Sequence, residues 1–160
     1  MTTLPLLLLD VDGVLCPLGS GDGEMVESSN GYGSIRYARA LPARLATLAE
    51  AFDLIWATSW QEEANEVLCP LFGLPPLPIV PFGDLRFKQG QTWKLPAIRK
   101  YVRDRPLAWL DDEIGGHDAR RWAQRRKVPT LLLDVRADVG LTDEHVDALL
   151  RFSASVIGSG

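Results

Sequence analysis

Two carboxylates, one residue apart, stand at the end of an apolar segment near the start of the chain. Asp10 and Asp12 close the segment Leu-Leu-Leu-Leu-Asp-Val-Asp, and Gly13 follows them. Ligand sites in open α/β sheets lie just beyond the carboxyl ends of strands. Two carboxylates there repel each other unless a proton or a cation intervenes, and Mg²⁺ prefers carboxylate oxygens. The pattern predicts a site for a divalent cation; the alternative is an acidic turn that only ends a strand.

Hydroxyl groups follow a second apolar segment. Thr58 and Ser59 come after Leu-Ile-Trp-Ala, at the expected start of a helix. Hydroxyls and free backbone N–H groups in such a position bind anions, including phosphate groups. The alternative is that Ser59 simply caps the helix. Taken alone, this motif favours the capping role.

Acidic residues follow a third apolar segment, and a lysine precedes it. Asp111, Asp112 and Glu113 come after Ala-Trp-Leu and are followed by two glycines. A solvated acidic loop is the alternative interpretation. Lys94 stands at the start of a helical pattern, where a lone lysine usually faces solvent. Its interest lies in its place in the order of the motifs.

The elements that must position these residues alternate between strands and helices. Continuous apolar segments, which are typical of strands covered on both faces, predict a parallel sheet; they are 6–11, 53–58, 79–82, 107–110 and 130–135. Helical patterns lie between or after them, at 41–51, 61–68, 94–102, 117–127 and 142–152. This alternation predicts an α/β fold with helices on both faces of the sheet.

The composition is that of an ordinary globular domain. The chain has 160 residues, 46% of them apolar and 24% charged, with a net charge of -4. Cys16 and Cys69 match no metal spacing and are too few for a disulfide scaffold. The apolar run at 4–9 is short and ends in Asp10, so we expect no signal peptide, no membrane span and a cytoplasmic protein.

The order of the motifs resembles that of the haloacid dehalogenase (HAD) superfamily. In that superfamily Asp-x-Asp-Gly, then a threonine or serine, then a lysine, then an acidic pair follow one another on a Rossmann-like sheet. The resemblance covers roughly residues 4–135. The sequences Trp-Ala-Thr-Ser-Trp at 56–60 and Trp-Leu-Asp-Asp-Glu at 109–113 look like those of a small capless branch, some of whose members are associated with RNA repair. The resemblance to the HAD superfamily implies a three-layer fold with a mostly parallel five-stranded sheet and no cap domain.

The resemblance also implies catalytic roles. Asp10 would be the nucleophile that forms an aspartyl-phosphate, and its ordinary pKa near 3.9 would keep it ionised at neutral pH. Asp12 would be the general acid toward the leaving group and then the base toward water. Thr58 would hold a phosphoryl oxygen, with Ser59 as the alternative. Lys94 would neutralise phosphoryl charge and orient Asp10.

The same resemblance implies Mg²⁺ as the cofactor. Asp10, the main-chain carbonyl of Asp12, and the pair Asp111 and Asp112 would hold the ion. Which member of the pair contacts it directly is left open, and Glu113 is expected to lie farther out.

The spacing of the motifs leaves no room for a cap domain. Residues 13–57 and 59–93 are the two places where one would be inserted, and both are already filled by a Gly-rich segment, helices and a Pro-rich loop. We therefore expect a single domain over residues 1–160, with a flap at about 13–37. Tyr32 and Tyr37 are candidate substrate contacts on that flap; a disordered surface loop is the alternative. An open site would admit phosphate groups on large molecules, such as a protein or a nucleic-acid end.

Basic residues are concentrated late in the chain. Nine of the seventeen lysines and arginines lie between Arg99 and Lys127. They suit either a patch for a phosphate backbone or, as we favour at this stage, the solvated faces of two helices. Trp60, Trp93 and Trp122 are expected to be packing groups, although the first two adjoin motif residues and could line the site. His117 and His145 are expected at the surface.

The sequence therefore predicts a Mg²⁺-dependent phosphatase that acts through an aspartyl-phosphate on an unidentified phosphorylated substrate. The alternative is a HAD-like binding or regulatory domain with little turnover, associated with nucleic-acid repair. A receiver domain is set aside, because Asp53 begins its strand instead of ending it. Neither a membrane partner nor an oligomeric state is indicated.

Overall fold

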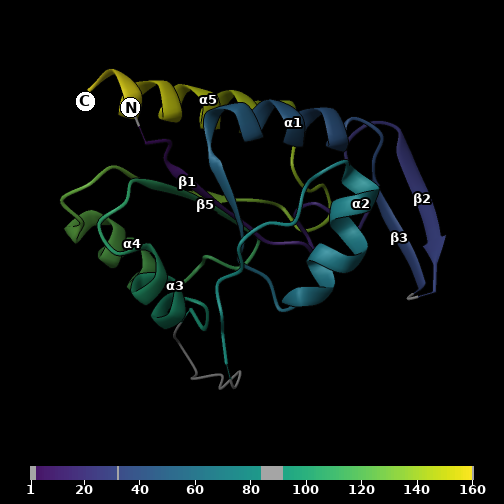
Figure 1. The fold of residues 1–160 in the computed structure, drawn as a ribbon, viewed down its shortest axis with the longest axis horizontal. Coiled ribbons are helices and arrows are strands. Elements are labelled where there is room, and N and C mark those ends of the chain that lie inside the picture. The colour runs from purple at the N-terminus through teal and green to yellow at the C-terminus, as the bar shows by residue number, and fades with distance from the viewer. Residues whose placement is uncertain (1–2, 32, 84–91, 160) are drawn as a thin grey trace.

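Four parallel strands form the central sheet of the computed structural model, which describes residues 3–31, 33–83 and 92–159 (Figure 1). The strands lie in the order β4-β1-β5-β6. Their bounds are β1 Leu6–Leu9, β4 Asp53–Trp56, β5 Leu107–Asp111 and β6 Thr130–Asp134. The chain goes from β1 to one neighbour, β4, and then returns to the other, β5. The end of β1 therefore lies where the strand order reverses, which is where open α/β sheets bind ligands.

The side chains of each strand divide between two cores, because successive residues of a strand point to opposite faces. On β1, Leu7 and Leu9 belong to one buried cluster, whereas Leu6 and Leu8 belong to the other. The first cluster holds α1 (Leu41–Ala51) and α5 (Asp143–Gly158). The second holds α3 (Leu95–Val102) and α4 (His117–Arg125). Figure 1 shows these two helix pairs on opposite sides of the strands. The predicted α/β fold with helices on both faces is confirmed.

The third expected strand does not form. Residues 79–82 contribute only an isolated parallel bridge between Ile79 and Trp56, so the sheet has four strands where five were expected. A Pro-rich approach removes backbone donors from this segment, which limits ladder formation. The helix expected at 61–68 is a π-helical segment, Ala64–Leu68, that continues into α2 (Cys69–Phe72).

The segment expected to be a flap contains a β-hairpin. Its strands are β2 (Met25–Asn30) and β3 (Gly33–Ala38), which pair antiparallel. Tyr37 is buried, and its ring packs edge-on against Phe72 at 5.2 Å between ring centroids. Its expected role as a substrate contact was therefore wrong. Tyr32, the other candidate, lies outside the described residues. No cap domain is evident within the described residues.

The expected surface position of His145 was also wrong. His145 is half-buried, and its Nδ1 accepts a hydrogen bond from the backbone N–H of Thr142 at 3.0 Å. The Thr142 hydroxyl accepts in turn from the His145 N–H, so the pair forms a capping box at the start of α5. Burial lowers the pKa of His145, which favours the neutral ring that this acceptor role requires. No helix among the described residues is both long and apolar enough to cross a membrane.

Leu45 tests the packing of α1 on the sheet. Its side chain is completely buried in the first cluster. We expect Leu45→Ala to lower the free energy of unfolding by about 2–5 kcal/mol, since it removes apolar contacts and leaves a cavity. Chemical denaturation measures this change. Glu50→Ala, on the exposed side of the same helix, is the control and should change stability by less than about 0.5 kcal/mol. Equal effects of the two substitutions would contradict the packing described here.

Candidate active site

The register of the sheet brings the predicted motifs to one edge. Leu9 is the Cα partner of both Trp56 and Leu110, so the residues that follow these three positions leave the sheet at the same level. Asp10 follows Leu9, Asp111 follows Leu110, and Thr58 comes two residues after Trp56. Asp10 and Asp111 continue the alternation of Leu8 and Trp109, which places both carboxylates on the α3 side of the sheet.

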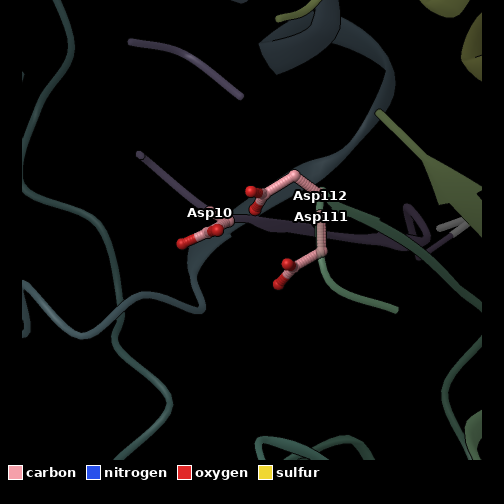
Figure 2. A group of neighbouring side chains, drawn as sticks. All are labelled: Asp10, Asp111 and Asp112. Atoms are coloured by element: carbon pink, nitrogen blue, oxygen red, sulfur yellow. The ribbon is translucent and has the colours of Figure 1, made fainter. Parts of the chain in front are cut away.

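Three carboxylates meet at this edge (Figure 2). Asp10, Asp111 and Asp112 each offer an oxygen, and these three oxygens lie within 4.8 Å of one another. Asp10 is 8% exposed and Asp111 is 1% exposed, so their charges are largely removed from water. A cluster of carboxylate oxygens alone suits a hard divalent cation.

Lys94 supplies a positive charge to two of these carboxylates. Its Nζ lies 3.0 Å from Asp10 Oδ1 and 2.6 Å from Asp111 Oδ2, and its side chain is buried. Burial lowers the pKa of Lys94, but Asp111 and Asp10 outweigh that effect and raise it above its ordinary value. The lysine therefore stays charged. Its position follows from the fold, because Lys94 is the N-cap residue of α3, which packs on the same face of the sheet as both aspartates.

Asp111 and Asp112 differ in what surrounds them. Asp111 Oδ2 accepts hydrogen bonds from Lys94 Nζ and, at 3.2 Å, from Trp109 Nε1, while Oδ1 accepts one from the Glu113 N–H at 2.9 Å. Asp112 is half-buried and lines a cavity of about 290 Å³ together with Asp10. The two neighbours thus have separate surroundings: Asp111 is enclosed by protein donors, and Asp112 faces the cavity.

The site carries more negative than positive charge. Burial is the main cause that raises the pKa of Asp10 from 3.8 to about 7, with Lys94 opposing the rise and Asp111 adding to it. Burial also raises the pKa of Asp112. The expectation that Asp10 keeps its ordinary pKa was therefore wrong for the protein without a cation. A divalent cation near these oxygens would favour their ionised forms.

Asp12 lies at the mouth of the cavity. Its side chain is exposed, and its Oδ2 accepts a hydrogen bond from Trp60 Nε1 at 3.0 Å. This bond fixes the carboxyl group without burying it. Trp93 also lines the cavity, so both tryptophans that adjoin the motifs are part of the site's surroundings.

The two hydroxyls after β4 occupy different environments. Thr58 is completely buried, and its Oγ1 accepts a hydrogen bond from the Trp60 N–H at 3.2 Å. Ser59 is exposed and lines the cavity. The turn is thus held by Thr58, while Ser59 presents its side chain to the space beside Asp10.

Gly13 is required where the chain turns away from Asp12. Its φ is +77°, and a Cβ atom built there would lie 2.5 Å from Asp112 Oδ2. Any other residue would therefore be strained and would displace the Asp112 carboxylate.

Cys16 is close by in the chain, but burial and the charge of Asp12 raise its pKa to about 12. Its thiol stays protonated and is not a nucleophile at neutral pH.

Asp118 supports the site from a distance in the sequence, and motif reasoning missed it. Its Oδ2 accepts a hydrogen bond from the Thr92 N–H at 3.1 Å, and its Oδ1 accepts from the Thr92 hydroxyl at 2.9 Å. Although burial acts in the other direction, these bonds lower the pKa of Asp118. Thr92 stands two residues before Lys94, so Asp118 anchors the segment that delivers the lysine. The acidic first turn of α4 was visible in the sequence, but its partner was not.

Fold and site together define a HAD-type α/β domain with an acidic, lysine-bridged centre at the end of β1. The chain belongs to the family described as the HAD domain in Swiss Army Knife RNA repair proteins, whose sequence model matches residues 6–146. A search of curated proteins found no match. Membership places the chain in a superfamily of phosphoryl-transfer and related hydrolases that typically bind Mg²⁺, and the acidic cluster could hold such an ion.

The Asp118 anchor can be tested by its removal. Asp118→Ala leaves the buried Thr92 N–H and hydroxyl without their acceptor, so we expect the free energy of unfolding at neutral pH to fall by about 1–3 kcal/mol. Urea denaturation measures the loss. Asp147→Ala, at an exposed position of α5, is the control and should be nearly silent. If the two variants are equally stable, Asp118 is not an anchor.

The raised pKa of Asp10 makes stability depend on pH. The folded protein, with a pKa of about 7, holds the Asp10 proton more tightly than the unfolded chain, with a value near 3.8. The stability gained from this tighter proton binding is fully present below the pKa of Asp10 in the unfolded chain. It is lost as the pH rises to the pKa of Asp10 in the folded protein. In Asp10→Asn the side chain does not titrate, so the variant does not lose this stability as the pH rises. We expect the Tm of the variant minus that of the parent, measured with a chelator present, to increase from about pH 5 to about pH 8.

Asp147→Asn is the control for this pH series, because it removes one exposed carboxylate of the same type. Its Tm difference from the parent should not increase across the range. A constant difference for Asp10→Asn would contradict the buried, charge-rich environment described above.

Proposed function

We propose that this HAD domain is a Mg²⁺-dependent phosphatase that transfers a phosphoryl group to Asp10 and then to water. The observation that carries the proposal is the buried Lys94 ammonium, which lies 3.0 Å from Asp10 and 2.6 Å from Asp111 at the end of the central strand. A cationic group in that place lets a carboxylate approach an anionic phosphate and stabilises the charge of the transferring oxygens. Family membership over residues 6–146 agrees with this chemistry.

The residues present fit Mg²⁺. Asp10 and Asp112 have oxygens in the cluster of three carboxylates and line the cavity, so we assign both as direct ligands, together with the main-chain carbonyl of Asp12. Asp111 belongs to the same cluster, but its oxygens already accept hydrogen bonds from Lys94, Trp109 and the Glu113 N–H. We therefore assign it the role of holding Lys94 beside the ligands. When bound, the ion offsets the repulsion between Asp10 and a phosphate group.

In the first step, a carboxylate oxygen of Asp10 attacks phosphorus, and the bond to the leaving oxygen breaks. Asp12 donates a proton to that oxygen as it leaves, which its place at the mouth of the cavity allows. The product on the protein is an aspartyl-phosphate. Lys94 orients the attacking carboxylate through its ion pair with Asp10. One hydroxyl of the turn formed by Thr58 and Ser59 donates a hydrogen bond to a phosphoryl oxygen.

In the second step, water attacks the phosphorus of the aspartyl-phosphate. Asp12, now ionised, accepts a proton from that water, and the bond between phosphorus and the Asp10 oxygen breaks. Inorganic phosphate is released, Asp10 returns to its carboxylate form and Asp12 is again protonated. The hydrogen bond from Trp60 keeps the Asp12 carboxyl group at the mouth of the cavity during both proton transfers.

The shape of the site supports a phosphate group on a large molecule. Asp12 and Ser59 are exposed beside the cavity, and no cap domain encloses it within the described residues. We propose that the chain works as one domain on such substrates. The second candidate function is a binding or regulatory domain with little turnover; the family description supports its association with RNA repair.

Asp10 is the residue whose loss distinguishes the two functions. We expect Asp10→Asn to lower the rate of p-nitrophenyl phosphate hydrolysis in the presence of Mg²⁺ by at least about 1,000-fold, because an amide is not a nucleophile for this reaction. A chelator should reduce the activity of the parent to a similar level. Asp147→Asn is the matched control and should retain full activity. Equal rates for parent and Asp10→Asn would refute the phosphatase and leave the binding domain.

Within the same assay, Thr58→Val and Ser59→Ala assign the phosphoryl contact. The variant that loses activity at a temperature where it is still fully folded identifies the donating hydroxyl. Thr58→Val should also lower stability, since it removes the acceptor of the Trp60 N–H.

A further inference from the structure

A groove between α3 and α4 gathers arginine side chains. Its volume is about 550 Å³, and its lining includes Arg99 from α3 and Arg121 and Arg125 from α4. Figure 1 shows α3 and α4 lying side by side. The groove is separate from the cavity at the aspartates, with which it shares no lining residue.

Other basic residues of the same stretch hold the fold together. Arg105 pairs with Asp53, and Arg120 pairs with Asp134. Arg126 donates to the main-chain oxygens of Arg103 and Arg105. These arginines have structural partners, so their presence needs no ligand.

The three groove arginines lack such partners. Among residues 3–31, 33–83 and 92–159, no carboxylate or carbonyl oxygen pairs with the side chains of Arg99, Arg121 or Arg125. Asp118 also lines the groove, but its oxygens accept hydrogen bonds from Thr92 and Ala119. One acid against three arginines leaves an excess of positive charge in a concave surface. The three arginines are exposed, as expected for solvated helix faces, and the groove that they line carries a positive charge complementary to an anion.

An aromatic side chain lies among these charges. Trp122 lines the groove and is half-buried, and the Arg126 guanidinium lies 4.9 Å from the centre of its ring. Part of the Trp122 side chain packs against the second core cluster, and the rest is exposed in the groove. Unpaired arginines beside a partly exposed aromatic ring suit single-stranded nucleic acids, since phosphates bind the cations and bases stack on aromatic rings. An acidic peptide would use the cations but would gain little from the ring.

The groove starts beside the active site. Leu95, the residue after Lys94, is part of its lining. Arg99 follows five residues after Lys94, about 7.5 Å along the axis of α3. The lining of the groove and the lining of the cavity therefore meet between Leu95 and Lys94.

We propose that this groove binds the phosphodiester backbone of single-stranded RNA whose phosphorylated end enters the site at Asp10. The placement of the end rests on the proposed phosphatase function, whereas the binding of the strand does not. RNA is the nucleic acid that the family description names.

The test measures binding of a short fluorescent single-stranded RNA with a terminal phosphate, by anisotropy over a range of salt concentrations. We expect Arg121→Ala combined with Arg125→Ala to weaken binding roughly tenfold at about 100 mM salt. The slope of log affinity against log salt should fall by about 1.4, since each phosphate contact on a single strand contributes about 0.7. Arg99→Glu is a second variant, on the other helix, and should also weaken binding.

The matched control is Lys100→Ala combined with Lys127→Ala, which removes the same charge from exposed positions outside the groove. It should change the affinity less than about threefold. Circular dichroism melts establish that each variant is folded. Equal weakening by control and groove variants, or no RNA binding by the parent at low salt, would overturn the proposal. Competition by polyglutamate as effective as that by RNA would overturn it in favour of an acidic protein partner.

Hydrolysis of p-nitrophenyl phosphate separates this proposal from the previous one. The groove variants should hydrolyse this small substrate as the parent does, because it contacts only the site at Asp10. A parent that binds RNA through the groove but hydrolyses no phosphate would refute the phosphatase and leave the groove standing. A parent that hydrolyses p-nitrophenyl phosphate but shows no groove-dependent RNA binding would refute the groove proposal and leave the phosphatase standing.

Discussion

The buried ion pairs of Lys94 are the interaction on which the site depends. An ammonium group in the protein interior is costly unless carboxylates compensate it, and here Asp10 and Asp111 do so at 3.0 Å and 2.6 Å. That arrangement requires β1 and β5 to be neighbours and α3 to start on the face toward which both aspartates point. The sheet order β4-β1-β5-β6 meets the first condition, and the anchor between Asp118 and Thr92 supports the second.

The same pairing leaves an imbalance that accounts for the chemistry. One lysine cannot neutralise Asp10, Asp111 and Asp112. Burial raises the pKa of Asp10 to about 7, and Lys94 does not offset this rise fully. Buried carboxylates in excess of the lysine cost stability and could hold a cation, a combination that is common at functional sites. Trp109 and the Glu113 N–H bind Asp111 and keep Lys94 in place, while Asp112 remains directed to the cavity.

The arginines between Arg99 and Arg126 fall into two groups. Salt bridges and backbone contacts use Arg105, Arg120 and Arg126 to join segments of the fold. The remaining arginines of α3 and α4 converge on a groove beside Trp122. The acidic cluster beside Lys94 and the arginines of the groove carry opposite charges, so the net charge of -4 describes neither.

Local sequence determined the four strands of the central sheet, the helix at 41–51 and the residues that end β1, β4 and β5, because apolar runs and polar strand ends are encoded by near neighbours. It did not reveal the hairpin of β2 and β3, whose short strands are largely polar and lie in a segment interrupted by glycines, nor the reduction of 79–82 to one bridge. Only the tertiary structure separated Asp111 from Asp112, paired Asp118 with Thr92 across 26 positions and sorted the arginines. Such contacts depend on how distant elements pack, and no local pattern records that.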